Sequence, residues 1–231
     1  MTNTLPQGVF YSSSLRGPAQ RAIIFANGPM TDVAAARASL RPGDRLIAAD
    51  GGLRHLQALG LTPDMLVGDL DSVQPGEAAA LEAGGVRIHR HPERKDETDL
   101  ELALRLALEE GAGEVVILGG LGGRWDQTLA NLLLLAHPDF RAARVRLLDG
   151  AQQVYLVQGE THIEGQPGDT VSLIALGGDA QGVTTTGLEY PLTEGRLPFG
   201  STLGISNVLV GERATVRVRE GVVGCVVGGR Q

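Results

Sequence analysis

Cysteine is almost absent from this 231-residue chain, whose single example is Cys225. One thiol excludes an internal disulfide and a cluster of thiolate metal ligands. Aromatic residues make up 3% of the chain, too few for a platform that stacks the bases of single-stranded nucleic acid. No apolar run approaches the roughly 20 residues that cross a bilayer, and the N-terminal residues lack the charged start and apolar block of a signal peptide. We therefore expect a cytoplasmic protein with no membrane contact.

Lysine is just as scarce: Lys95 is the one lysine among 20 basic residues, and the others are arginine. Its neighbour Arg94 excludes a Walker A loop, which needs the sequence Gly-Lys-Ser/Thr, and the protein-kinase motifs need a strand lysine as well. The glycine-rich run 119–123 does not complete a G-x-G-x-x-G fingerprint, because Trp125 stands at the place of the last glycine. The net charge of -7 argues against binding to nucleic acid or to anionic membranes.

The first 150 residues alternate short apolar runs with amphipathic stretches. The runs that we predict as strands are 21–26, 45–49, 65–67, 86–88, 114–118 and 144–148. The stretches that we predict as helices are 31–39, 51–59, 76–83, 98–110 and 126–136. Thr98 is the expected N-cap of the fourth helix, with Glu101 as its capping-box partner, and Gly111 is expected to end it. Strand–helix alternation of this kind predicts a mostly parallel sheet with helices on both faces.

After about residue 150 the pattern and composition of the sequence change. Helical periodicity disappears, and glycine, threonine and valine dominate. Alternating runs at 154–157, 170–175, 214–219 and 222–227 predict short strands separated by glycine-bearing turns. Such a pattern is typical of a small β-sandwich or barrel. We therefore expect an α/β half followed by an all-β half, packed directly together.

Aspartates gather where the predicted strands of the first half end. Asp50 follows the second strand, Asp69 and Asp71 follow the third, Asp96 and Asp99 the fourth, and Asp126 the fifth. Because ligands of an open α/β sheet bind outside the carboxyl ends of its strands, these side chains should converge on one crevice. Crowded carboxylates call for a neutralising cation. Hard oxygen ligands without histidine or thiolate suit Mg²⁺, with water and substrate phosphates completing its coordination.

Each aspartate alone has a simpler interpretation, because an aspartate at the start of a helix is often only a cap or a turn residue. The prediction therefore depends on the whole set. His89 and His91 are interpreted as a solvated strand end, since no third ligand lies at a suitable spacing. The residues alone predict a magnesium-dependent enzyme that acts on a phosphorylated or nucleotide substrate.

Six short motifs follow one another along the chain. The first three are acidic: Ala49-Asp50-Gly51-Gly52, Gly68-Asp69-Leu70-Asp71-Ser72 and Asp96-Glu97-Thr98-Asp99-Leu100-Glu101. A glycine-rich motif at 119–131 comes next, and the stretches 187–192 and 204–207 end the series. In this order, over roughly residues 21–210, the motifs resemble those of the thiamine pyrophosphokinase family.

The resemblance implies a nucleotide-binding α/β domain over 1–150, followed by a thiamine-binding β-sandwich over 151–231. It also implies a homodimer that binds thiamine between its subunits and transfers the pyrophosphoryl group of ATP to the thiamine hydroxyl, giving thiamine diphosphate and AMP. The implied magnesium ligands are Asp69, Asp71 and Asp99, which form the catalytic set together with Asp50. The implied contacts are Lys95, Asp96, Arg124, Asp126 and Gln127 for the nucleotide, and Ser206 and Asn207 for thiamine.

Two positions depart from the family pattern. Val208 stands where many relatives have an acidic residue, and Gln127 stands where bacterial members often have histidine, so we expect no histidine proton relay there. One aspartate could accept the hydroxyl proton, but the residues do not indicate which. Two other functions stay open: a pyrophosphokinase for another hydroxymethyl heterocycle, such as a pterin, and a non-catalytic nucleotide or thiamine sensor.

Overall fold

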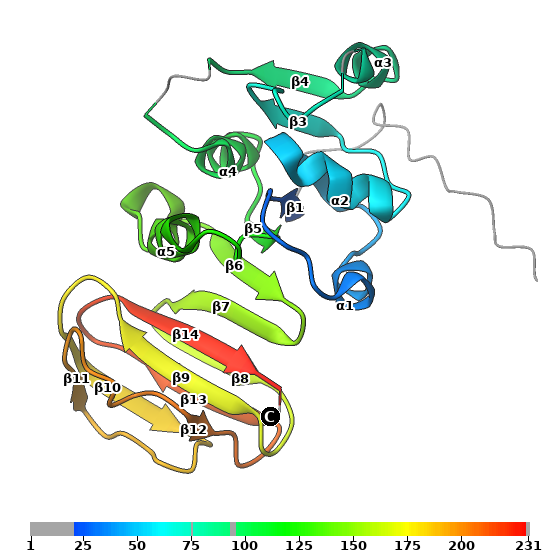
Figure 1. The fold of residues 1–231 in the computed structure, drawn as a ribbon. Helices are drawn as coiled ribbons and strands as arrows, with labels where there is room; N and C mark the ends of the chain where they lie inside the picture. Colours follow the sequence, from blue (N-terminus) through cyan, green and yellow to red (C-terminus); the bar gives the residue numbers. More distant parts are fainter. Residues whose placement is uncertain (1–20, 75, 93–95, 230–231) are drawn as a thin grey trace, which may run out of the picture.

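A parallel sheet forms the centre of the N-terminal half. In the computed structural model, which describes residues 21–74, 76–92 and 96–229, six parallel strands run in the order β6-β5-β1-β2-β3-β4 (Figure 1). The strands are β1 (Arg21–Phe25), β2 (Arg45–Ala49), β3 (Met65–Gly68), β4 (Arg87–Arg90), β5 (Glu114–Leu118) and β6 (Arg144–Asp149). The chain proceeds from β1 outward to β4, and then continues on the other side of β1 with β5 and β6. The strand order therefore reverses between β1 and β5, which is where a ligand crevice is expected.

Helices cover both faces of this sheet, because its inner strands are apolar on both sides. On one face lie α1 (Val33–Ala38), α2 (Leu53–Ala58) and α3 (Glu77–Ala83), and on the other lie α4 (Asp99–Glu109) and α5 (Trp125–Leu134). Short 3-10 turns occupy η2 (Asp50–Gly52) and η3 (Pro138–Phe140). The structure confirms each strand and helix predicted for this half, with ends that differ by two residues at most.

The caps of α4 agree with the sequence. Thr98 Oγ1 accepts a hydrogen bond from the backbone N–H of Glu101 at 3.2 Å. Gly111 follows the helix with φ +86°, a left-handed conformation that glycine adopts without strain. The N-terminal cap matters for function, since Thr98 and Asp99 line the large cavity described below.

The C-terminal half is a β-sandwich and not a barrel. Four strands extend the parallel sheet to ten: β7 (Gln152–Val157), β14 (Val223–Gly228), β9 (Thr170–Ala175) and β12 (Asn207–Val208). The second sheet is made of β8 (Glu160–Glu164), β13 (Arg213–Arg217), β10 (Ala180–Thr186) and β11 (Gly195–Leu197). Buried valines, leucines and Cys225 fill the space between the sheets. The sequence does not predict β8, β10, β11 or β12.

The large sheet continues across residue 150. A two-residue turn joins β6 to β7 as an antiparallel hairpin, and Val154 of β7 belongs to the same apolar core as α4 and β5. In the strand order, β12 lies at one edge and β3 lies next to the other edge, eight strand spacings away. At about 4.8 Å for each spacing, ~40 Å separates these strands along the sheet. Of the helices in the described part of the chain, none is long and apolar enough to span a bilayer.

Candidate active site

A cavity of about 790 Å³ opens where the strand order reverses, between β1 and β5. Its walls come from the segments that follow β1, β2, β3 and β5, together with the first turn of α4. The polar and glycine residues that line it include Asn27, Gly28, Asp50, Arg54, Asp69, Thr98, Asp99, Gly119, Gly120, Gly122, Gly123, Arg124, Gln127 and Asn131. Of the six aspartates predicted to converge on one crevice, Asp50, Asp69 and Asp99 line this cavity.

Three carboxylates cluster beside this cavity, and two of them, Asp50 and Asp69, line it. Asp50, Asp69 and Asp71 each offer an oxygen atom, and these atoms lie within 4.8 Å of one another. Left-handed backbone positions shape the two turns: Asp50 has φ +44°, and Leu70, between the other two aspartates, has φ +67°. Hydrogen bonds hold the group, because Ser72 Oγ donates to Asp50 Oδ1 at 2.7 Å and the Asp71 N–H donates to Asp69 Oδ1 at 3.1 Å.

The chemistry of this donor set fits a hard divalent cation. All three ligand atoms are carboxylate oxygens, with no histidine or thiolate among them. Three negative charges at this separation repel one another, so a bound cation is favoured, and oxygen-only ligands are typical of Mg²⁺. The group differs from the predicted ligands in one member. Asp50 joins Asp69 and Asp71, while Asp99 lines the same cavity outside this trio.

Two glycines let the segments around the cavity approach one another. A Cβ atom on Gly52 would lie 1.8 Å from the carbonyl oxygen of Phe25, at the end of β1. A Cβ atom on Gly28 would lie 2.4 Å from the carbonyl oxygen of Gly119, after β5. Any side chain at these positions would push the neighbouring segments apart. The glycines therefore set the width of the crevice beside Asp50.

Arg54 and His55, which the sequence analysis does not single out, hold the loop that follows β1. Arg54 donates from Nη1 to Asn27 Oδ1 and from Nη2 to the Asn27 carbonyl oxygen, both at 2.6 Å. His55 Nε2 lies 2.8 Å from the carbonyl oxygen of Gly28. Burial lowers the pKa of His55, so the ring is neutral at pH 7 and its Nε2 proton is the one donated to this oxygen. The sequence signal that could have found them is their place just after the Asp50-Gly-Gly motif, from which only Leu53 separates them.

The polar side of α5 holds the glycine-rich loop 119–123. Asn131 Nδ2 donates to the carbonyl oxygen of Gly120 at 2.7 Å. Thr128 Oγ1 accepts a hydrogen bond from the Gly122 N–H at 3.0 Å. Both side chains are buried. The position of α5 therefore determines the backbone geometry of the loop that forms one wall of the cavity.

Some of the residues predicted to contact the nucleotide line the cavity, and others lie outside its lining. Arg124 and Gln127 line the cavity, whereas Asp96 and Asp126 lie outside its lining. Asp126 forms an exposed ion pair with Arg124, and the hydrogen bond from that guanidinium lowers the pKa of the Asp126 carboxyl. Lys95 lies outside the described residues.

Ser206 and Asn207 lie far from the carboxylates, at the opposite edge of the large sheet. Of the strands next to the cavity, β5 is nearest to β12 in the sheet order, five spacings away, which is about 24 Å. Asn207 fixes a neighbouring loop, since its Oδ1 accepts from the Tyr190 N–H at 3.0 Å and its Nδ2 donates to the Tyr190 carbonyl oxygen at 2.8 Å. Ser206 has φ +60°, and its N–H donates to Ser172 Oγ at 3.0 Å. Within one chain, these residues and the carboxylates cannot contact the same small substrate.

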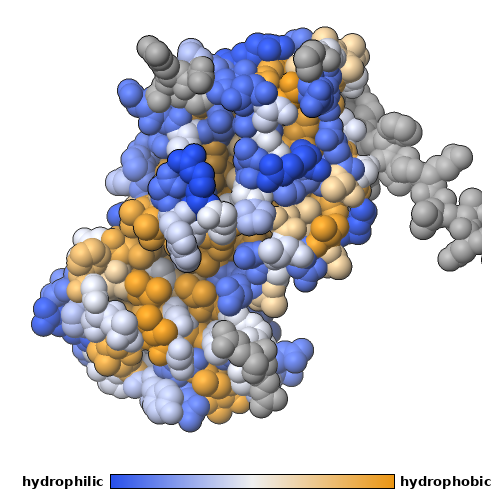
Figure 2. All heavy atoms as spheres, viewed as in Figure 1, coloured by the Kyte–Doolittle hydropathy of each residue, from blue (hydrophilic) through white to orange (hydrophobic). Residues whose placement is uncertain are grey.

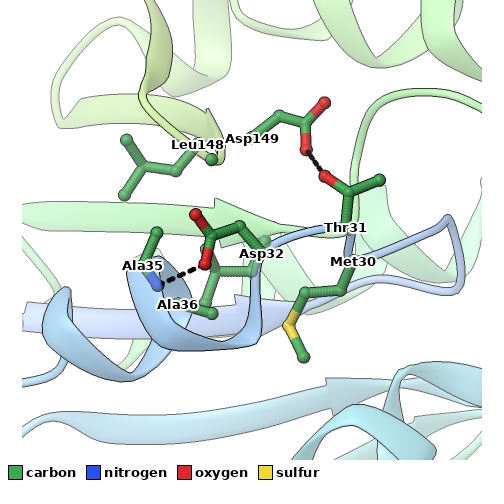
Figure 3. Close-up of a pocket in the computed structure, with 10 residues that line it drawn as sticks. Met30, Thr31, Asp32, Ala35, Ala36, Leu148 and Asp149 are labelled. Carbon is green, nitrogen blue, oxygen red and sulfur yellow. Dashed lines mark hydrogen bonds between the residues drawn. The ribbon is translucent and has the colours of Figure 1, made fainter.

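A second cavity, at the ends of β5 and β6, is too small for a substrate (Figure 3). Its volume of about 20 Å³ has room for roughly one water molecule. The polar side chains around it have structural partners. Asp32 accepts a hydrogen bond from the Ala35 N–H at 2.8 Å as the cap of α1, and Thr31 Oγ1 donates to Asp149 Oδ1 at 3.1 Å.

Comparison with known proteins gives two matches to family models. Residues 38–147 match the model described as thiamin pyrophosphokinase, catalytic domain, and residues 160–223 match the model described as thiamin pyrophosphokinase, vitamin B1 binding domain. A thiamine pyrophosphokinase of Bacillus subtilis is 34% identical over 179 residues, which cover 77% of this chain and 84% of that protein. A crystal structure of thiamine pyrophosphokinase from Bacillus subtilis superposes with a TM-score of 0.82 at 30% identity, covering 91% of this chain and 100% of that one.

A weaker match bears on the alternative substrate. The 6-hydroxymethyl-7,8-dihydropterin pyrophosphokinase of Pyrococcus furiosus is 27% identical over 140 residues, which cover 47% of this chain and 60% of that protein. Both the identity and the covered share are lower than for the thiamine pyrophosphokinase of Bacillus subtilis.

Proposed function

Because the chain belongs to the thiamine pyrophosphokinase family, we propose that its large cavity binds ATP with Mg²⁺ and that the protein transfers the pyrophosphoryl group of ATP to the hydroxyl of thiamine. The products are thiamine diphosphate and AMP. The observation that carries this proposal is that Asp50 and Asp69, which cluster with Asp71, line one cavity together with glycines of the loop 119–123. Phosphoryl transfer needs charge neutralisation and positioning, which are what such a cavity supplies.

The reaction needs no covalent help from the protein. The hydroxyl oxygen of thiamine bonds to the β-phosphorus of ATP, the bond between that phosphorus and the oxygen of the α-phosphate breaks, and AMP leaves. The hydroxyl proton passes to a carboxylate, to a phosphate oxygen or to water. Cys225 takes no part, because it is buried in the sandwich and burial raises its pKa to about 11. The role of the protein is to hold the thiamine hydroxyl in line with the phosphorus–oxygen bond that breaks.

We assign the Mg²⁺ ligands to Asp69 and Asp71, as the family resemblance implies, and add Asp50 as the third member of the trio. Asp99, the remaining predicted ligand, lines the cavity from the first turn of α4 and is proposed as a further ligand. When bound, the metal would neutralise charge on the phosphates. Ser72 contributes by holding the Asp50 carboxylate through its hydroxyl.

We place the nucleotide against the loop 119–123 and the start of α5. Arg124 and Gln127 line the cavity there and can donate hydrogen bonds to phosphate oxygens. Asp126 acts on the nucleotide only through Arg124, because it pairs with that guanidinium on the exposed side. The contacts predicted for Lys95 and Asp96 stay predictions.

Thiamine is placed at Ser206 and Asn207 of a second subunit. In one chain these residues are at least about 24 Å along the sheet from the strands that form the cavity, a distance that a thiamine molecule does not span. A two-fold symmetric homodimer would bring the edge strand β12 of each subunit to the cavity of its partner. The α/β half, residues 1–150, would then bind ATP and Mg²⁺, and residues 151–231 would bind thiamine. The cytoplasmic location stays a prediction.

The direct test is to incubate the protein with thiamine, ATP and Mg²⁺ and to identify the products by mass spectrometry. We expect AMP and thiamine diphosphate in equal amounts, and no turnover in EDTA. ADP with thiamine monophosphate would contradict attack on the β-phosphorus. A parallel reaction with a hydroxymethyl pterin tests the alternative substrate, and ligand binding in EDTA without turnover in Mg²⁺ would indicate a sensor.

A further inference from the structure

The segment that follows β1 places one amide side chain at the large cavity. Asn27 lines this cavity together with Asp50, and the residue is exposed. In the space-filling view, hydrophilic side chains predominate over the N-terminal half, and hydrophobic surface gathers over the β-sandwich (Figure 2). A ligand that enters from this half therefore meets polar groups first. What the amide can offer to such a ligand depends on how its oxygen and nitrogen are oriented.

The guanidinium of Arg54 fixes the orientation of this amide. Arg54 donates from Nη1 to Asn27 Oδ1 and from Nη2 to the Asn27 carbonyl oxygen, both at 2.6 Å. Because arginine has donors and no acceptor, the atom that faces it must be the amide oxygen and not the amide nitrogen. The amide cannot turn over without breaking a charge-assisted hydrogen bond.

Gly51 provides the surface on which the amide rests. A Cβ atom on Gly51 would lie 2.7 Å from Asn27 Nδ2, 2.5 Å from its Cγ, and closer still to its Oδ1. Real Cβ atoms do not approach other atoms so closely, so only glycine leaves room for the amide here. Since Gly51 directly follows Asp50, the amide lies next to the turn that carries one member of the carboxylate trio.

The nitrogen of this amide is left as a hydrogen-bond donor. Among the residues that the structure describes, none accepts a hydrogen bond from Asn27 Nδ2. Asn131, the other asparagine of the cavity lining, differs in this respect, because its Nδ2 donates to the carbonyl oxygen of Gly120 at 2.7 Å. Asn27 therefore combines a fixed amide orientation with two N–H groups that a ligand can use.

We propose that Asn27 is a substrate-contacting residue, whose Nδ2 donates a hydrogen bond to a phosphate oxygen of the bound nucleotide. The inference rests on the proposed function and adds a contact to it. A phosphate oxygen fits the place, because the amide lies next to the turn of Asp50, and substrate phosphates bind beside carboxylates that hold Mg²⁺. Arg54 is then a positioning residue, which orients the amide and adds positive charge near the phosphates.

The variant Asn27→Asp separates this role from a structural one. A carboxylate keeps the shape of the side chain and an acceptor for Arg54, so a residue that only held the loop would tolerate the change. It has no proton to donate at pH 7, and it repels phosphate. We expect the dissociation constant for ATP with Mg²⁺, measured by calorimetry without thiamine, to rise at least about thirtyfold. The melting temperature without ligand should stay at or above that of wild type, because the new charge pairs with Arg54.

The matched control is Gln181→Glu. It makes the same change from amide to carboxylate at an exposed position of β10, in the second sheet of the sandwich. The net charge of the two variants is equal, so a general effect of charge on ATP binding would appear in both. We expect Gln181→Glu to bind ATP with wild-type affinity.

A second measurement uses wild-type protein and does not depend on the folding of a variant. The side-chain amide signals of Asn27 are assigned in ¹⁵N-labelled protein by triple-resonance spectra, and ATP with Mg²⁺ is then added. We expect one of the two Nδ2 proton signals to move downfield, because a hydrogen bond to a phosphate oxygen deshields the donated proton. The Nδ2 signals of Asn131 should move less, because that amide already has its acceptor.

The outcomes separate the inference from the proposed function. Wild-type affinity for ATP in Asn27→Asp, or unmoved Nδ2 signals of Asn27 in protein saturated with ATP, would overturn the contact. A wild-type protein that binds ATP and shows both effects, but forms no thiamine diphosphate, would contradict only the proposed function. A wild-type protein that does not bind ATP would overturn both.

Discussion

At the residue scale, the carboxylate trio depends on backbone conformations as much as on side chains. Asp50 and Leu70 both have positive φ angles, and a residue of this kind costs of order 1–3 kcal/mol unless its surroundings favour it. Both positions belong to turns that carry the aspartates of the trio. The backbone strain and the repulsion between the carboxylates both oppose folding. The two turns therefore favour ligand binding and lower the stability of the fold.

The first prediction concerns Asp71. Asp71→Asn keeps the shape of the side chain and removes one negative charge, so we expect kcat to fall at least about a hundredfold at saturating Mg²⁺, the scale of losing one preorganised electrostatic contact. Thermal unfolding should occur at the same or a higher temperature, because repulsion within the trio decreases. Steady-state AMP release and calorimetry measure the two effects. Asp139→Asn, in an exposed ion pair on η3, is the control, and a normal kcat in Asp71→Asn would show that Asp71 is only a turn residue.

The second prediction concerns Arg54, which binds the Asn27 amide and backbone with its forked guanidinium. Lysine keeps the charge but cannot make both contacts in the same geometry. We therefore expect Arg54→Lys to raise the KM for ATP about tenfold, equivalent to one charge-assisted hydrogen bond of ~1.5 kcal/mol, with a smaller change in kcat. Arg37→Lys is the matched control, because Arg37 also donates to a backbone carbonyl oxygen, that of Leu59, but away from the cavity. Equal KM values for both variants would contradict a role for Arg54 at the site.

At the scale of elements, one carboxylate ties together the N-terminal ends of three adjacent strands. Glu114 at the start of β5 pairs with Arg21 of β1 and Arg146 of β6. Burial alone would raise the pKa of Glu114, but Arg146, Arg21 and Arg41 together outweigh it and hold the pKa below its usual value. Because the pKa is lower in the folded protein than in the unfolded chain, the ion pairs stabilise the fold above the unfolded pKa, and this stability is lost as the pH falls through the folded pKa.

The third prediction follows from this cluster. Glu114→Gln should lower the free energy of unfolding at pH 7 by about 1–3 kcal/mol, because Arg146 and Arg21 lose a charged partner at partly buried positions. The difference from wild type should shrink as the pH falls below the ordinary glutamate pKa of 4.5. Urea unfolding between pH 7 and pH 3 measures both effects. Glu164→Gln removes an exposed ion pair with Arg213 and should change stability by less than about 1 kcal/mol; an equal effect in the two variants would contradict the argument.

The strands also show which parts of the fold can be predicted from the sequence and which cannot. The strands of the parallel half are buried on both faces and form apolar runs, as at Glu114–Leu118, so the sequence predicts them. β8 has a single buried residue, Ile163, and β12 has only two residues, so neither leaves an alternating pattern to detect. The two short strands depend on pairing with β13 and β9, which are distant in the sequence.

The same reasoning applies to the site. The aspartates could be located because each follows a strand, and strand ends share one edge of a parallel sheet. Whether Asp50 or Asp99 joins Asp69 and Asp71 depends on the left-handed turn at Asp50, which no sequence pattern reports. The loop held by Arg54 and His55 escapes prediction for a similar reason, since its contacts join the segment after β1 to α2, and only the fold brings these together.

At the scale of the whole molecule, the continuous sheet keeps the two halves of the site apart. β12 and β3 are connected through eight strand spacings of one sheet, and the hairpin between β6 and β7 leaves no flexible linker between the halves. A hinge motion that closes the site within one chain would have to break that sheet. The molecule is therefore expected to complete its site only by pairing with another copy, and complementation between two inactive variants can test this.

The fourth prediction is that mixed subunits recover activity. Asp71→Asn disables the ATP side of a site, and Asn207→Trp blocks the thiamine side, with Asn207→Ala as a smaller change that also loosens the contact to Tyr190. If each site uses Asp71 of one chain and Asn207 of the other, a mixed dimer has one site with both changes and one site with neither. Random exchange makes half of the dimers mixed, so roughly a quarter of wild-type activity should return. Activity is measured before and after exchange, which native mass spectrometry verifies. A mixture that stays inactive after verified exchange would place both residues in the site of a single chain, and the sheet would then have to bend far more than its strand order allows.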